Sequence, residues 1–228
     1  MTQTISYRFF APNEKPTQIN LHFDDKTFLI QLHENMERPA WAKLSHQKCS
    51  NCPLGDDIEW CPAALAIADF LPIFKEKFSY EKTIVEVETP SRTIVSKATF
   101  QTGIASLLGL ACATSGCPLT KFLRPLARFH LPFANEQETV FRSLAASLLA
   151  QYVENSKNGH NKPLTFDTLN DNYAALSIVN GFLAERLRDG VERDAALNAV
   201  IILDGFALIT PENTDGSFID LEDVFCVE

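Results

Sequence analysis

Apolar and polar positions alternate along the first third of the chain, and this alternation predicts β structure. Short runs rich in Ile, Phe, Tyr and Thr are separated by Asn-Glu-Lys-Pro and Asp-Asp-Lys, and both spacers favour turns. The pattern is typical of a small antiparallel meander. Its three predicted strands cover residues 6–11, 18–23 and 27–32.

A second hairpin is predicted further along the chain. Residues 82–89 and 91–97 are β-prone and flank a turn at Pro90. In the first of these runs valines alternate with glutamates, so we expect one face to be buried and the other to contact water.

From about Phe100 onwards apolar positions recur every three or four residues, which predicts helices. The first of these helices breaks at residues 114–116. A further segment begins after Cys117, where the next proline can occupy the first position of a helix, and Pro125 is expected to kink or end it. A shorter apolar helix, residues 63–71, precedes the second hairpin.

Three longer helices are predicted beyond this point. One starts at Asn135, the next ends near Gly190 after a polar linker at residues 156–163, and residues 195–209 are apolar on most sides and predict a buried helix. The first two each carry one apolar stripe. The stripes are Val140, Phe141, Leu144, Leu148, Leu149 and Tyr152, and then Leu169, Tyr173, Leu176, Val179, Leu183 and Leu187.

Together these patterns predict an α+β fold, with small antiparallel hairpins at the N-terminus and a mainly helical C-terminal two-thirds. We expect a single domain over residues 1–228. Its predicted parts are a β-rich region 1–97 that contains a cysteine segment 46–62, a helical region 98–210 and a C-terminal tail 211–228.

Composition narrows the class of protein. A chain of 228 residues with 46% apolar content can bury a substantial core without covalent staples. The N-terminal residues lack the pattern of a signal peptide, and the longest uninterrupted apolar run, residues 104–113, is too short to span a bilayer. We therefore expect a cytoplasmic protein without a membrane segment, in which clustered cysteines bind metal or do chemistry.

The net charge of −9 argues against a nucleic-acid-binding protein, because phosphate backbones favour clustered Lys and Arg. The charge is unevenly distributed. Residues 89–135 contain no Asp or Glu, and their five Lys and Arg residues give +5, which leaves −14 on the rest of the chain. This acid-free segment is expected to attract acidic parts of the chain or an outside ligand.

Four cysteines form the best candidate metal set, namely Cys49, Cys52, Cys61 and Cys117. Cys49 and Cys52 are separated by two residues, a spacing that lets two sulfurs reach one ion. Cys61 and Cys117 each precede a proline, so each is expected at a helix N-cap, where backbone N–H groups favour the thiolate that a metal requires.

Zinc is the expected metal, since tetrahedral thiolate sites are its commonest structural use. An iron–sulfur cluster is the alternative, because the three Cys-Pro pairs resemble cluster-binding segments, although no complete cluster motif is present. Buried free cysteines are the third interpretation. It is the default one for Cys112 and Cys226, and His46 is interpreted as a surface histidine rather than a ligand.

A catalytic alternative uses Cys117 as a nucleophile with His130 as its base. Motifs for nucleotide binding, dinucleotide binding, serine hydrolases and zinc proteases are missing, so we lean towards a protein that is not an enzyme. Asp69 and Asp204 lie in apolar helices. For both we favour a salt bridge to an arginine such as Arg124 over a catalytic role.

The acid-free segment also holds a candidate anion site. Arginine offers planar bidentate donors to anions, and several basic residues lie close together in this stretch. The candidate residues are Lys121, Arg124, Arg128 and His130. The alternative is that these residues balance a negative metal–thiolate centre and pair with acids elsewhere.

The chain also resembles a bacterial domain family of unknown function. The likeness rests on H-x2-C-x2-C-P, C-P-A-A-L, A-T-S-G-C-P and F-L-R-P-L-A-R-F-H-L-P-F, and it spans nearly the whole sequence. The resemblance implies a bacterial cytosolic protein that forms one architectural unit. It supplies no reaction, substrate or metal.

The leading functional hypothesis is a metal-stabilised cytosolic bacterial protein. It would bind a protein partner or a small anionic ligand through the acid-free segment 89–135. The alternatives are an iron–sulfur redox or sensor protein and a cysteine-dependent enzyme that uses Cys117.

Overall fold

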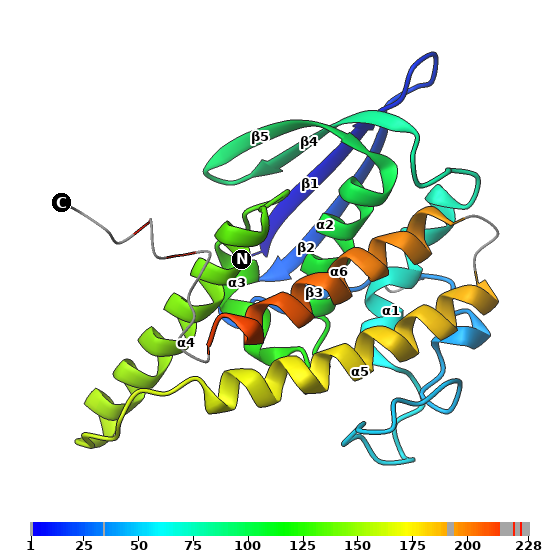
Figure 1. Cartoon of the computed structure of the whole chain (residues 1–228). Coiled ribbons are helices and arrows are strands. Elements are labelled where there is room, and N and C mark those ends of the chain that lie inside the picture. The colour runs from blue at the N-terminus through cyan, green and yellow to red at the C-terminus, as the bar shows by residue number, and fades with distance from the viewer. Residues whose placement is uncertain (1, 34, 191–193, 215–220, 222–223, 225–228) are drawn as a thin grey trace.

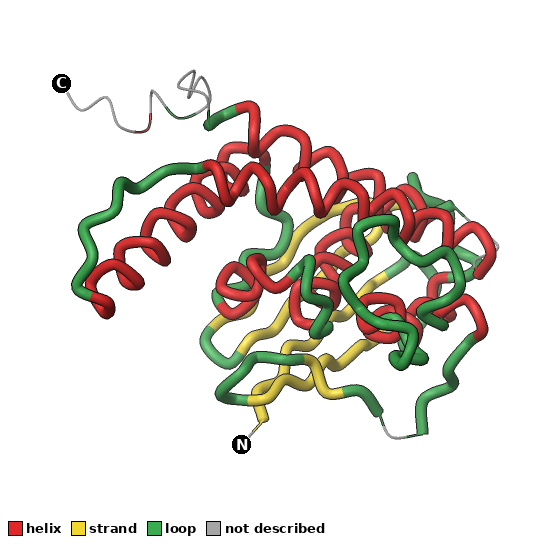
Figure 2. Tube along the Cα trace, turned by 90° about the horizontal axis from the view of Figure 1, so that it is seen from below, coloured by secondary structure: helices red, strands yellow, loops and turns green. Residues whose placement is uncertain are grey.

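The computed structural model describes residues 2–33, 35–190, 194–214, 221 and 224. In this part of the chain an antiparallel five-stranded sheet has one face covered by helices, as Figures 1 and 2 show from two directions. The predicted α+β class is therefore confirmed, with the sheet built from the N-terminal part and most helices from the remainder.

Both predicted hairpins form, and they join into one sheet. The strands are β1 (Thr2–Phe10), β2 (Thr17–Asp24), β3 (Ile30–Gln31), β4 (Lys82–Thr89) and β5 (Arg92–Thr99). Their order is β3-β2-β1-β4-β5, and β1 pairs with β4 with Phe9 opposite Val85. The chain between β3 and β4 therefore leaves the sheet and returns, and this excursion carries the cysteine segment.

The helices are six α-helices and three short 3-10 helices within the described residues. They are α1 (Pro62–Ala68), α2 (Phe100–Thr114), α3 (Arg124–Arg128), α4 (Glu136–Asn158), α5 (Asp167–Gly190) and α6 (Ala195–Glu212), with η1 (Ala40–Ala42), η2 (Leu71–Phe74) and η3 (Lys121–Leu123). The start predicted at Asn135 is confirmed. Its side chain accepts a bond from the Glu138 amide, and the Glu138 carboxylate accepts one from the Asn135 amide, so that the two residues form a capping box.

The main core lies between the sheet and the helices. The strands alternate as predicted, so that Tyr7, Phe9 and Val85 point inwards and are fully buried. The Phe9 ring stacks on Phe100 with centroids 5.8 Å apart and meets the edge of Phe74 at 4.9 Å. Because these rings come from β1, α2 and η2, they fix the first helix of the helical half against the sheet.

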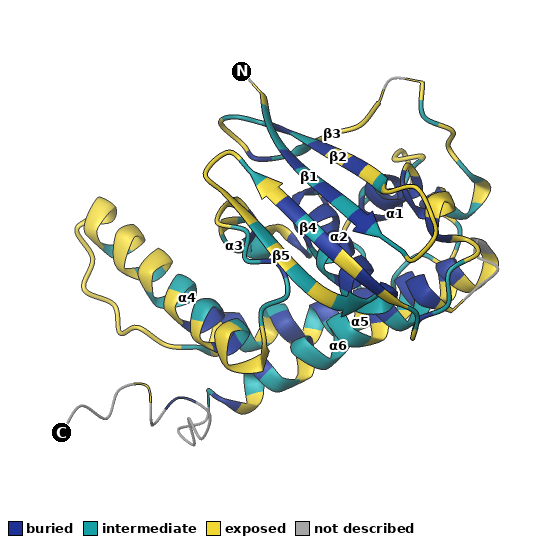
Figure 3. Cartoon of the chain, turned by 90° about the horizontal axis from the view of Figure 1, so that it is seen from above, coloured by how far each residue is buried: buried dark blue, intermediate teal, exposed yellow. Residues whose placement is uncertain are grey.

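The opposite face of the sheet is uncovered, as the exposed and half-exposed positions along the strands in Figure 3 show. Arg8 on β1 forms ion pairs there with Glu86 and Glu88 on β4. These are the glutamates expected to contact water. Cross-strand pairs of this kind contribute little individually but favour the observed register.

Two sequence predictions about the segment after α2 are wrong. Residues 118–120 form a turn, not the start of a helix, and the chain then passes through η3 into α3. Pro125 neither kinks nor ends α3. It lies in the first turn, where its missing N–H costs no hydrogen bond.

The predicted buried helix 195–209 is also only partly correct. Helix α6 extends to Glu212, two residues into the predicted tail, and Ile201 and Leu208 are 57% and 56% exposed. By length and composition α6 could cross a membrane, but here it packs beside α5 and against α2 (Figure 1). Most of the rest of the predicted tail lies outside the described residues.

The apolar stripe on α4 is buried only near the start of the helix. Val140 and Leu144 lie in a small cluster with α5 and α6, whereas Leu149 and Tyr152 are each 62% exposed. Figure 3 shows why, since the second half of α4 extends away from the other helices.

Gly103 should be essential for the contact between α2 and the sheet. A Cβ at this position would lie 2.6 Å from the Phe9 ring and 2.9 Å from Val85, both fully buried. We expect Gly103→Ala to lower the free energy of unfolding by ~1–3 kcal/mol, because overpacking outweighs the gain in helix propensity. Urea denaturation measures this.

Gly181→Ala on α5 is the matched control, because a Cβ there meets no atom within 4 Å. It should raise the free energy of unfolding by up to about 1 kcal/mol. Equal effects of the two substitutions would contradict the close packing of α2 on the sheet.

Candidate functional site

The base of the cysteine segment is closed by backbone pairing. The Leu44 amide donates to the Glu59 carbonyl at 2.8 Å, and the Cys61 amide donates to the Ala42 carbonyl at 2.9 Å. Lys43 and Trp60 form an antiparallel bridge between these two bonds. Residues 45–58 therefore form a loop whose two ends are held together beside Cys61.

Helix α5 holds the far part of this loop. The Asn51 side chain donates to the Ala175 carbonyl at 3.0 Å, and His46 lies 2.9 Å from the Asp189 carboxylate. Inside the loop, the Cys52 amide donates to the Cys49 carbonyl and forms a turn. His46 is half-buried and has a partner on α5, so its interpretation as a surface histidine is only partly correct.

Cys61 lies where the sequence predicts, at the N-cap of α1. Its backbone is extended, with φ −70° and ψ 118°, Pro62 begins the helix, and the Cys61 carbonyl accepts the first helical bond from Leu65. Cys61 is buried, and α1 packs against α2.

Cys117 is positioned by a turn instead of a helix. Gly116 has φ +89°, a left-handed conformation that favours glycine, and it redirects the chain as α2 ends. The Ser115 hydroxyl accepts a bond from the Cys117 amide at 3.2 Å. Although Cys117 is not at a helix N-cap, the nearby backbone amides of Leu119 and Thr120 oppose the rise in its pKa that burial causes.

All four predicted cysteines lie in one region. Cys61 and Cys117 belong to the same buried cluster, and Cys52 packs against it. Burial, together with negative charge on Cys61, Cys52 and Cys117, raises the pKa of Cys49 to about 11. Charges shift the pKa of a neighbouring group only when they lie near it, so the structure gathers sulfurs from the loop, from the start of α1 and from the turn after α2.

The sulfurs do not, however, surround a common point. Among residues 2–33, 35–190, 194–214, 221 and 224, no three His, Cys, Asp or Glu side chains form a ready-made metal site, and the five cysteines among them are free thiols. Burial raises the pKa of Cys49 and of Cys117, so these two thiols keep their protons at pH 7. A bound cation would displace such protons and draw the sulfurs inwards.

Sequence reasoning missed Arg186 on α5. Its side chain is 1% exposed, and it donates to the carbonyls of Trp41, Lys43 and Leu44 at 2.8, 2.7 and 3.2 Å. Its positive charge lowers the pKa of Cys49. The cation that favours ionisation of this thiol therefore comes from α5. The sequence signal that could have identified it is an arginine placed within an apolar stripe, between Leu183 and Leu187.

Of the remaining two cysteines, Cys112 fits its interpretation as a buried free cysteine. Cys112 is buried in the main core, and burial, together with charge on Cys117 and Cys61, raises its pKa to about 12. Cys226 lies outside the described residues.

The basic residues of the acid-free segment have different surroundings. Arg128 donates to the carbonyls of Asp25 and Lys26 at 2.9 Å and lies over the Phe28 ring. Lys121 is exposed and lines a groove next to α4 and α5.

Arg124 and His130 complete the candidate anion set. Arg124 Nε is buried and has no hydrogen-bond acceptor among the described residues. His130 accepts or donates a 2.5 Å bond with the Tyr7 hydroxyl, which also bonds the Ser106 hydroxyl at 2.8 Å. Of the four residues, His130 alone lines the pocket between α2, α3 and α6.

A pocket of about 220 Å³ lies beside His130. Its walls come from α2, α3, the chain between α3 and α4, the first turns of α4, and α6, and most of its lining residues belong to the acid-free segment. Burial, together with the nearby charge of Arg142, lowers the pKa of His130 to about 3, so the imidazole is neutral at pH 7. The pocket thus presents a neutral histidine and an arginine amid apolar side chains.

The salt bridges to arginine predicted for Asp69 and Asp204 do not form. Asp69 is exposed and lies 3.6 Å from His33, while Asp204 accepts bonds from Ser177 at 2.8 Å and Asn180 at 3.4 Å. Both helices are only partly covered at these positions, so each carboxylate reaches water or a polar neighbour without an arginine.

The thiol and imidazole of the catalytic alternative also have different neighbours. His130 bonds Tyr7, whereas Cys117 packs in the cluster with Cys61. The neutral imidazole, with a pKa of about 3, is a weak base for activating a thiol.

These features define a small α+β protein with a cluster of four cysteines and a separate basic, largely apolar pocket. The chain belongs to the family described as Domain of unknown function (DUF6901), whose model matches residues 5–226. No curated protein and no solved structure matches it.

The buried histidine should make stability depend on pH. Because the pKa of His130 is about 3 in the folded protein and 6.5 ordinarily, the unfolded chain binds a proton on this ring more readily than the folded chain as the pH falls. The contribution of the neutral, buried His130 to stability is complete above about pH 6.5 and is lost as the pH falls towards 3. Between pH 7 and pH 5 wild type should lose about 2 kcal/mol more stability than His130→Gln.

Urea denaturation at several pH values measures this difference. His160→Gln, which replaces an exposed histidine, is the control and should follow the wild-type curve. Identical pH dependence of wild type and His130→Gln would show that His130 is not buried in its neutral form.

Proposed function

We propose that this is a cytosolic bacterial metal-binding protein in which Cys49, Cys52, Cys61 and Cys117 hold one ion. The carrying observation is the gathering of these thiols from three separate segments into one region. The acid-free segment 89–135 would then supply the surface that binds a small anionic ligand or a partner.

The donor set fits a soft or borderline metal. Four thiolates suit zinc, which needs only tetrahedral closure, and an iron–sulfur cluster is the alternative for the same set. The nearby amides of Leu119 and Thr120 lower the pKa of Cys117 and so favour its ionised form. Bound zinc would supply structural cross-linking of the three segments.

The protein's own groups would hold the site in place. The backbone pairs at Leu44 and Cys61 fix the base of the loop, and Asn51 fixes its far part on α5. Arg186 binds three carbonyls of the segment that leads into the loop, and it offsets negative charge at the thiols. Because the thiols come from both halves of the chain, metal binding would add to the folding free energy.

The side chains that line the pocket beside His130 support the ligand-binding half of the proposal. No acidic side chain lines the pocket among the described residues, and His130 and Arg142 both face it. An anion bound there would meet no carboxylate.

Purified protein should contain about one zinc per chain, measured by elemental analysis with an ultraviolet-visible spectrum on material prepared without oxygen. We expect Cys117→Ser to lose the metal and to lower the melting temperature, because it removes a ligand from the helical half. Cys112→Ala is the control, since it also removes a buried thiol but should keep the metal.

Each result has a definite meaning. Iron with sulfide and visible absorbance would replace zinc by the iron–sulfur alternative while keeping the four ligands. Folded, metal-free wild type, or Cys117→Ser with unchanged metal content, would overturn the proposed metal site.

A further inference from the structure

The pocket beside His130 has the make-up of a ligand site for a small molecule. About 220 Å³ of space lies between α2, the region of α3, the start of α4 and α6. Well-packed interiors leave few spaces larger than a water molecule, and a cavity of roughly 150 Å³ accommodates benzene. By this comparison the pocket suits a molecule of about ten non-hydrogen atoms.

Most of the wall is apolar. Leu110 of α2, Leu126 of α3, and Ile202, Leu203 and Phe206 of α6 supply aliphatic and aromatic surface. Such walls favour an apolar chain or ring and give no hydrogen bonds to it. The ligand should therefore be apolar over most of its length.

One polar group in the wall is the imidazole of His130. Its Nε2 is 2.5 Å from the Tyr7 hydroxyl, which in turn bonds Ser106. If Ser106 donates to Tyr7 and Tyr7 donates to Nε2, the proton of the neutral ring lies on Nδ1 and is available as a donor. A ligand with a hydrogen-bond acceptor facing Nδ1 would favour the tautomer that carries its proton on Nδ1.

The second polar group is the guanidinium of Arg142. Its Nη2 donates to the carbonyls of Leu126 and Phe129, both at 2.9 Å, so the group is anchored to the chain around α3. Its Nη1 and Nε have no acceptor among the described residues. Glu138, one turn earlier on α4, offsets part of the charge, but its carboxylate bonds the Asn135 amide in the capping box.

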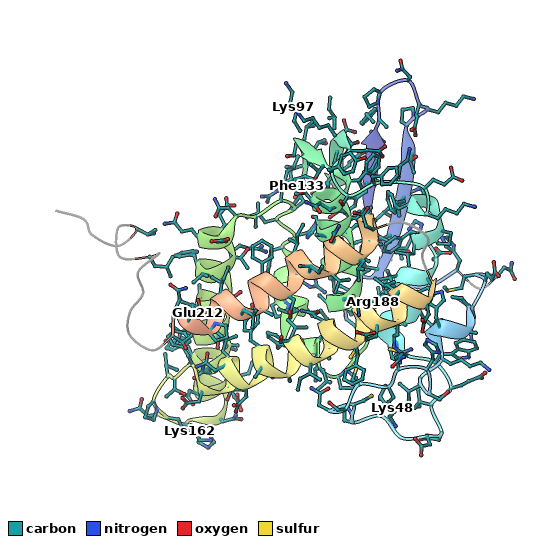
Figure 4. All side chains as sticks on the ribbon, turned by 45° about the vertical axis from the view of Figure 1, so that its right-hand side comes forward. Lys48, Lys97, Phe133, Lys162, Arg188 and Glu212 are labelled. Atoms are coloured by element: carbon teal, nitrogen blue, oxygen red, sulfur yellow. The ribbon has the colours of Figure 1, made fainter. Side chains whose placement is uncertain are left out.

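Phe133 forms a wall shared with a neighbouring groove. This groove is lined by Phe10 and Lys97, among others, and Figure 4 shows Phe133 and Lys97 on the same side of the molecule. Phe133 has φ 63°, which is uncommon for a bulky side chain and follows the buried Pro132. The strained backbone holds the aromatic ring at the boundary of the pocket.

We propose that this pocket binds a small monocarboxylate with an apolar tail, its carboxylate between His130 and Arg142 and its tail against α6. The proposal rests on the ligand-binding half of the proposed function and names its site and ligand class. It is independent of the metal, because no cysteine lines the pocket among the described residues.

Octanoate, with ten non-hydrogen atoms, is the probe, and 1-octanol and octylamine are its neutral and cationic counterparts. Titration calorimetry on full-length protein should show octanoate binding at least about tenfold more tightly than either, because charged hydrogen bonds discriminate strongly. Methyl NMR signals of Ile202 and Leu203 should shift, while those of Leu65, in the cysteine cluster, should not.

Arg142→Gln should weaken octanoate binding at least about tenfold and reduce the preference over octanol. Arg188→Gln is the matched control, because Arg188 is exposed and pairs with Glu185 on α5. Since Arg142 also anchors two carbonyls, folding of both variants is checked by their NMR spectra. The comparison of octanoate with octanol on wild type tests the proposal without any substitution.

Three results would overturn the inference. These are no binding of octanoate at millimolar concentration, equal affinity for octanoate and octanol, or shifts confined to signals away from Ile202 and Leu203. Metal content measured on the same samples reports separately on the cysteine site, so the two proposals can fail independently.

Discussion

Helix α2 lies directly on the sheet, and both candidate sites depend on this contact. Gly103 permits it, because Phe9 and Val85 occupy the space that any side chain would need. From this fixed position the C-terminal end of α2 leads into the turn that carries Cys117, and one side of the helix brings Ser106 to Tyr7 and forms a wall of the pocket. A displacement of α2 would therefore alter the thiol cluster and the pocket together.

Two buried or half-buried arginines show how this fold anchors cations on backbone carbonyls. Arg186 is held by three carbonyls next to the cysteine loop, and Arg142 by one carbonyl within α3 and one just after it. Backbone carbonyls orient a guanidinium without neutralising it, so each cation keeps its attraction for negative charge. In one region the groups that can become negative are the cysteine thiols. In the other no acidic side chain lines the described pocket.

The sequence predicted the fold class, both hairpins, and the starts of α1 and α4, because alternation, turn residues and capping residues are local signals. It failed where tertiary contacts decide. Pro118 was compatible with a helix start, but the left-handed Gly116 and the bonds of Ser115 and Thr120 favour a turn. The outward extension of α4 and the exposure of α6 also depend on neighbouring elements, which a single helix pattern does not contain.

For the candidate sites, spacing and Cys-Pro pairs were enough to select four cysteines that the fold brings into one region. The spacing and the Cys-Pro pairs gave no information on the residues that approach from α5, since Arg186 is far from the four cysteines in sequence. The basic cluster was harder to interpret. Charge alone could not show that Arg128 binds carbonyls near β2 while His130 turns inwards to Tyr7, because that difference arises from the path of the chain after α3.

The pairing of β1 with β4 also constrains the order in which the chain can fold as it is synthesised. β1 ends at Phe10 and β4 begins at Lys82, so the intervening residues must leave the ribosome before the centre of the sheet can close. Until then the first hairpin presents an open edge on β1, with Tyr7 and Phe9 uncovered by α2. Open edges and exposed apolar faces promote association between chains. The nascent protein should thus be most vulnerable to aggregation over this interval, before the second hairpin and α2 emerge.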